Sequence, residues 1–136
     1  MRKILGSVVG IVVAFAIMIG VDLCAMQLHA PPAGIAPGPE ATAAWLANAP
    51  VVALAIIVLA WFLAALGGGY AAIRTARWPA AAWVVAAIVL ISAVMGALRP
   101  PHPLWMQVGA VVAPLLGAWL AIRLPRAAPT ATPDAA

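Results

Sequence analysis

Charged residues are scarce in this sequence. Only 7% of its 136 residues are Asp, Glu, Lys or Arg, whereas a soluble domain carries about 25%. Hydrophobic residues make up 67% of the chain, against about 45–50% in a soluble domain. A domain of this length buries only about two-thirds of the surface that its unfolded chain exposes. Folding in water could not hide this much apolar surface, so the composition excludes an ordinary soluble domain.

Cysteine is nearly absent, and the motifs of common enzymes are missing. Cys24 is the only cysteine, which excludes an internal disulfide and a zinc site built from several cysteines. The sequence contains no GxSxG, HExxH or CxxC motif and no glycine-rich phosphate loop followed by Lys and Ser or Thr. The basic residues behind the net charge of +4 form no run and no stripe with aromatic residues. We therefore expect no enzyme activity, no metal or cofactor and no nucleic-acid partner.

Long apolar runs are present instead. A helix that spans a bilayer needs about 20 mostly apolar residues, and four segments of the chain satisfy this, at about 4–28, 51–73, 79–98 and 104–122. Prolines and arginines lie between the segments, and proline interrupts a helix because it lacks the amide hydrogen. We predict an all-α bundle of four transmembrane helices over residues 1–126. Residues 127–136 are mostly Ala, Pro and Thr, which predicts a disordered tail.

A cleaved signal peptide is the alternative for the first segment, because Arg2 and Lys3 precede an apolar run. The run continues from Ile4 to Val21, whereas the apolar region of a signal peptide has about 7–15 residues. No pair of small residues follows at the spacing that a signal peptidase requires. We therefore expect the first segment to remain as a membrane span.

The basic residues predict the orientation, because Lys and Arg near span ends are retained in the cytoplasm. One side of the predicted bundle carries all but one of them: Arg2, Lys3, Arg74, Arg77, Arg123 and Arg126, with Arg99 alone on the other side. We therefore predict that both termini are cytoplasmic. Ala dominates the sequence and six of the seven basic residues are Arg, which is typical of a GC-rich bacterial genome, so we expect a bacterial protein. Trp61, near the middle of the second span, is expected to pack against another helix.

Glycines recur at spacings that favour close contact between helices. In lipid, small residues let two backbones approach, and GxxxG is the best-known example. The candidate packing residues are Gly6 and Gly10 in the first span, Gly67, Gly68 and Gly69 in the second, and Gly109 and Gly117 in the fourth. We expect them to pack the helices of one bundle together. A homodimer through these faces is the alternative.

Polar residues gather at the predicted outer face, where Asp22, His29, Arg99 and His102 form a candidate cluster. An ionisable residue inside a membrane is costly, so Asp22 is the first functional candidate. It could form an ion pair with Arg99 that joins the first and third spans, or alternate between protonated and charged states as a carrier requires. It could also reach water at the interface, or bind a metal with His29 and His102, although these ligands follow no recognised metal spacing.

Four short motifs are spread along the chain: Asp22 late in the first span, the loop from Pro31 to Gly34, the glycines 67–69, and Pro101 to Trp105 before the fourth span. In these the sequence resembles a group of uncharacterised small bacterial inner-membrane proteins with four spans. The resemblance covers nearly the whole chain except the tail. It implies the architecture and the membrane, and it implies no activity.

The predicted function is that of a non-enzymatic accessory or assembly protein of the inner membrane. Its expected partners are the lipid bilayer and either a second copy or another membrane protein. The alternative is a small proton-coupled transporter that uses Asp22. Transport needs polar groups through the middle of the membrane, and the central turns of the four predicted spans contain little besides Trp61 and Ser92. This scarcity favours the accessory role.

Overall fold

The computed structural model describes residues 1–28, 38, 40–41, 44, 48–98 and 102–124. Its elements are the helices α1 (Arg2–Leu28), α3 (Val51–Ala76), α4 (Ala81–Leu98) and α5 (Leu104–Arg123). All four helices are long and apolar enough to cross a membrane. The predicted all-α bundle of four transmembrane helices is confirmed. The tail at 127–136 lies outside the described residues.

Proline and a left-handed residue set the helix ends. Pro50 and Pro103 are the residues before α3 and α5. Proline lacks an amide hydrogen, but amides at the start of a helix have no partner within the helix, so proline costs no hydrogen bond there. At the other end of α3, Arg77 adopts the left-handed conformation (φ 53°, ψ 32°) and its amide donates to the Ile73 carbonyl oxygen at 2.8 Å. This arrangement closes a helix, and a short turn then leads into α4. The second span therefore continues to Ala76, beyond the expected Ile73.

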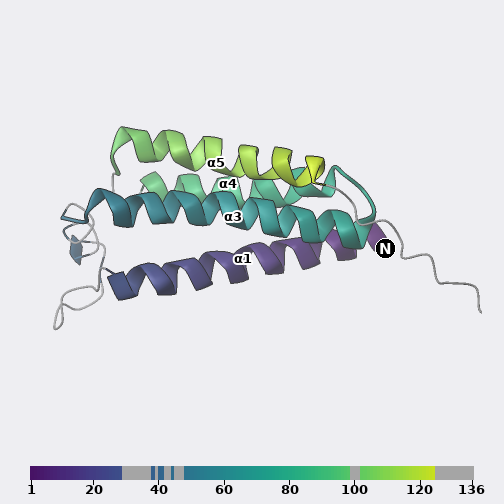
Figure 1. Ribbon diagram of the computed structural model, residues 1–136, viewed down its shortest axis with the longest axis horizontal. Helices are drawn as coiled ribbons and strands as arrows, with labels where there is room; N and C mark the ends of the chain where they lie inside the picture. Colours follow the sequence, from purple (N-terminus) through teal and green to yellow (C-terminus); the bar gives the residue numbers. More distant parts are fainter. Residues whose placement is uncertain (29–37, 39, 42–43, 45–47, 99–101, 125–136) are drawn as a thin grey trace, which may run out of the picture.

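The long helix α3 occupies the centre of the bundle (Figure 1). It contacts α1 on one side and α5 on the other, and α4 packs against all three. Within the described residues, α1 and α5 do not contact each other. The N-terminus and the end of α5 lie at the same end of the bundle (Figure 1). The four helices run alternately up and down in the order α1, α3, α4 and α5.

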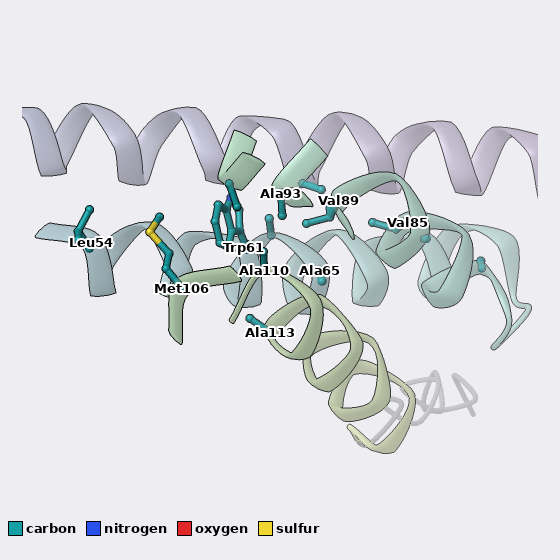
Figure 2. Packing of buried hydrophobic residues seen from close by; sticks show 14 of the residues in the cluster. Leu54, Trp61, Ala65, Val85, Val89, Ala93, Met106, Ala110 and Ala113 are labelled. Carbon is teal, nitrogen blue, oxygen red and sulfur yellow. The ribbon is translucent and has the colours of Figure 1, made fainter. Parts of the chain in front are cut away.

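The core is apolar and consists largely of alanine. Its larger members are Leu54, Trp61, Val85, Val89 and Met106, and alanines of α3, α4 and α5 fill the space around them (Figure 2). Trp61 is only 6% exposed, which agrees with its expected role in packing. No buried polar or charged residue occurs within the described part of the chain. Alanine-lined surfaces let the helix backbones approach closely, which is the main source of helix association in lipid.

Helix α1 is the peripheral member of the bundle. Its buried residues are Gly6, Gly10 and Ala14, all in its first half. From residue 15 to residue 27 no side chain of α1 is buried, although Ile17 and Met18 still touch the core. The axis of α1 diverges from α3 toward Leu28 (Figure 1). Only the first half of α1 is therefore packed tightly against the other helices.

Candidate functional site

The packing of α1 on α3 uses small residues on both helices. Gly6 faces Ala76, and Gly10 faces Ala72 and Gly68. A step of four residues forward along α1 therefore matches a step of four residues backward along α3, so the two helices run antiparallel. An added Cβ on Gly6 would lie 2.5 Å from the Ala76 nitrogen. A real Cβ never approaches a backbone so closely, so these positions admit glycine alone at the observed separation.

The other predicted packing glycines also meet neighbouring helices. Gly67 faces the Ile17 side chain of α1, and Gly69 faces Ala82 of α4 together with Ala121 of α5. In α5, Gly109 faces the Val58 side chain, while a Cβ on Gly117 would lie 2.6 Å from the Phe62 carbonyl oxygen. Each of the seven predicted glycines therefore takes part in contacts inside one bundle.

One end of the bundle carries every Lys and Arg that the structure describes; we call it the basic end. These residues are Arg2, Lys3, Arg74, Arg77 and Arg123. Arg99 and Arg126 lie outside the described residues. The described acidic residues, Asp22 and Glu40, belong to the outer half of α1 and to the segment that follows it. The charges of the described chain are thus separated along the bundle axis.

Aromatic rings and a backbone oxygen hold four of these cations. The ammonium of Lys3 lies 5.2 Å from the centre of the Trp78 ring, and the guanidinium of Arg123 lies 4.0 Å from that of Trp119. Arg74 lies 5.7 Å from the Tyr70 ring and donates to its hydroxyl at 3.3 Å. Arg2 donates from Nε to the Thr75 carbonyl oxygen at 3.3 Å, which ties α1 to the end of α3. The Lys3–Trp78 contact joins α1 to the α3–α4 turn, whereas the contacts of Arg74 and Arg123 lie within α3 and α5.

Asp22 lies in the divergent half of α1, on its exposed side. At about 1.5 Å per residue it lies about 9 Å inside the end of the helix at Leu28. Its carboxylate forms no hydrogen bond or ion pair with any residue that the structure describes, His102 included. The nearest turns along α1 offer only apolar side chains on the same face, Ile19 and Met26 among them.

Of the predicted outer cluster, the structure describes Asp22 and His102, while His29 and Arg99 lie outside the described residues. His102 occupies the turn before α5. Its Nδ1 lies 3.2 Å from the Ala97 carbonyl oxygen, and Gln107 Nε2 donates to the His102 carbonyl oxygen at 2.9 Å. These contacts connect the end of α4 with the start of α5. In the described part of the chain, no three His, Cys, Asp or Glu side chains are grouped as a metal site would require.

The exposed face of α1 is a feature that the sequence reasoning missed. A stripe of residues separated alternately by three and four positions runs along it: Leu5, Val8, Val12, Phe15, Ile19, Asp22 and Met26. We call this set the α1 stripe; all of its members are exposed. The spacing is that of a helix-pairing seam and is visible in the sequence. The sequence alone could not tell whether this seam or the glycine face meets α3.

Comparison of the chain with known protein families, with curated proteins and with solved structures gave no match.

Proposed function

We propose that the protein is a non-enzymatic accessory or assembly protein of the bacterial inner membrane, and that it associates with another membrane protein through α1. The observation that carries the proposal is Asp22 on the exposed side of the peripheral helix, without a partner among the described residues. Ionisable residues within spans nearly always face a protein interior or pair with another group. A second membrane protein would supply that surrounding for Asp22.

The arrangement of α1 supports the same role. Its first half is held in the bundle by the glycine contacts with α3 and by the contacts of Arg2 and Lys3 at the basic end. Its second half diverges from α3, and no side chain from residue 15 to residue 27 is buried. A partner can therefore contact this half without disturbing the packing that holds the four helices together.

The composition of the core favours association over the alternative of proton-coupled transport. A carrier must conduct its substrate past polar groups near the middle of the membrane. The buried residues that the structure describes are hydrophobic, glycine or proline, and Asp22 points away from them. The basic end supports an orientation with both termini in the cytoplasm, because Lys and Arg near span ends are retained there.

Photo-crosslinking in living cells tests the proposal. We would place a photoreactive amino acid at Val12 or Ile19 of the α1 stripe and, as matched controls, at Val112 or Leu116 on the exposed face of α5. The expected result is a discrete protein adduct from α1 and none from α5. An adduct of twice the mass of the chain would identify a second copy as the partner. Adducts with lipid alone from all four positions would contradict the accessory role.

A further inference from the structure

The α1 stripe differs from the other lipid-exposed faces in its charge. The exposed face of α5 is also apolar along its length, with Val108, Val112, Leu115 and Trp119 among its residues. An apolar face needs no partner, because lipid tails cover it as well as a protein can. The α1 stripe contains Asp22, and lipid tails cannot solvate a carboxylate. The charge therefore distinguishes a binding surface from an ordinary lipid-facing one.

A second copy of this chain is a poor occupant for the α1 stripe. Two copies in one membrane have the same orientation, and pairing through this stripe would bring the two Asp22 carboxylates together at one depth. Like charges at close range repel strongly where water is excluded. The described Lys and Arg residues cannot compensate, since they all lie at the basic end. Along the helix axis, Lys3 is about 28 Å from Asp22 at 1.5 Å per residue.

The occupant of the α1 stripe has to neutralise Asp22 and cannot bring a second carboxylate to the same depth. A transmembrane helix with a basic residue at the depth of Asp22 meets both requirements. We infer that the α1 stripe binds a transmembrane helix of another protein, and that this helix carries a Lys or Arg side chain opposite Asp22. The ion pair forms where Asp22 interrupts the stripe, and the apolar residues from Leu5 to Ile19 pack against the rest of the partner helix. This inference rests on the proposed accessory function and specifies the chemistry of the partner.

The geometry of α1 leaves Asp22 accessible to such a partner. Asp22 lies on the side of α1 that faces away from the glycine contacts with α3, so a long Lys or Arg side chain of a partner helix can reach its carboxylate from outside the bundle. The inner half of α1 stays fixed by Gly6 and Gly10. The α1 stripe is thus held in place by the inner half of α1 and is exposed along its whole length.

Liposome reconstitution with synthetic helices tests the inference. The full chain would carry a donor fluorophore in the α3–α4 turn (Ala80→Cys in a Cys24→Ser background), and a leucine-rich transmembrane peptide would carry the acceptor. Three peptides are compared, with Arg, Leu or Asp at the depth of Asp22. We expect energy transfer to report association at least about tenfold tighter for the Arg peptide than for the Leu peptide. Asp22→Leu should abolish this difference, and Asp22→Glu should retain it.

Several outcomes would overturn the inference. Equal association of the Arg and Leu peptides, or an unchanged preference for Arg in Asp22→Leu, would show that Asp22 does not select the partner. A preference for Arg that emerges only in Arg99→Gln would show that Asp22 is already neutralised within its own chain. Stronger association of two labelled copies in Asp22→Leu, without a preference for the Arg peptide, would assign the surface to a second copy. Adducts with a different protein at Val12 or Ile19 in cells would still support the accessory function when the peptide experiment fails, whereas adducts of twice the mass of the chain would not.

Discussion

Gly10 of α1 and Gly68 of α3 each occupy the space that a side chain on the other would need. A Cβ added to Gly10 would lie 2.6 Å from the Gly68 carbonyl oxygen, and a Cβ added to Gly68 would lie 2.5 Å from the Gly10 carbonyl oxygen. Both obstacles are backbone atoms, which cannot move aside without moving a whole helix. This pair therefore sets the distance between α1 and α3, and with it the position of the α1 stripe.

The first prediction concerns this pair. Gly68→Ala should lower the free energy of unfolding by about 1–3 kcal/mol, the usual cost of forcing extra atoms into a close-packed interface. Thermal or SDS-induced unfolding of the purified protein in detergent measures the change. Gly20→Ala and Gly96→Ala are the matched controls, because nothing lies within 4 Å of either added Cβ. These two should be neutral or stabilising, since alanine favours a helix more than glycine does. Equal effects at Gly68 and Gly20 would contradict the predicted interface.

The second prediction compares two glycines that face different kinds of atoms. At Gly117 an added Cβ would lie 2.6 Å from the Phe62 carbonyl oxygen and 2.9 Å from the Leu66 nitrogen. At Gly69 its nearest neighbour would be the Ala82 Cβ at 3.2 Å. A shift of a few tenths of an ångström relieves the contact at Gly69 but not the contacts at Gly117. Gly117→Ala should therefore destabilise the protein by at least about 1 kcal/mol, and Gly69→Ala by much less, in the same unfolding assay.

The glycines 67–69 show how far the sequence could predict this packing. Successive residues of a helix point about 100° apart, so three adjacent glycines cannot face one neighbour. In the structure Gly67 and Gly68 face α1, whereas Gly69 faces α4 and α5. The abundance of small residues predicted close contacts, but the identity of each partner depends on how α3 is rotated within the bundle. That rotation follows from all the contacts together and is not encoded in a local motif.

Asp22 shows the same limit for the candidate site. The distance in sequence from Asp22 to the end of the first apolar segment predicted how deep Asp22 lies in the membrane. The positions of the basic residues predicted that all but one of them lie at the opposite end of the bundle. The side of α1 on which Asp22 lies was not predictable, because α1 carries small residues on one face and a pairing seam on another. Packing through Gly6, Gly10 and Ala14 decides between them. The proposed ion pair with Arg99 remains a prediction, since Arg99 lies outside the described residues.

The third prediction concerns the stability of the isolated protein. Asp22 contacts no polar group among the described residues, so Asp22→Leu should change the free energy of unfolding by no more than about 0.5 kcal/mol. Chemical or thermal unfolding in detergent measures this change. Arg99→Leu and the double variant belong in the same experiment. If both single variants are destabilised and the losses are not additive, Asp22 and Arg99 form an ion pair within one chain.

The fourth prediction tests the orientation that the basic end supports. In a Cys24→Ser background, Ala80→Cys places a thiol in the α3–α4 turn, and Ala44→Cys places one in the segment between α1 and α3. A maleimide that cannot cross the membrane should label Ala44→Cys in bacterial cells whose outer membrane alone has been opened. It should label Ala80→Cys only after the inner membrane has been opened as well. The reverse pattern would place the basic end outside the cytoplasm.

The fifth prediction separates core packing from surface anchoring among the tryptophans. Trp61 is 6% exposed and belongs to the main core cluster, whereas Trp83 on α4 is 42% exposed. Replacing a buried aromatic residue by alanine removes its contacts and leaves a cavity, so Trp61→Ala should cost about 3 kcal/mol of unfolding free energy. Trp83→Ala should cost less than about 0.5 kcal/mol in the same assay, because detergent or lipid already surrounds its ring. Trp61→Phe keeps much of the ring and should recover more than half of the loss. Equal losses for Trp61→Ala and Trp83→Ala would mean that the centre of the bundle is not packed around Trp61.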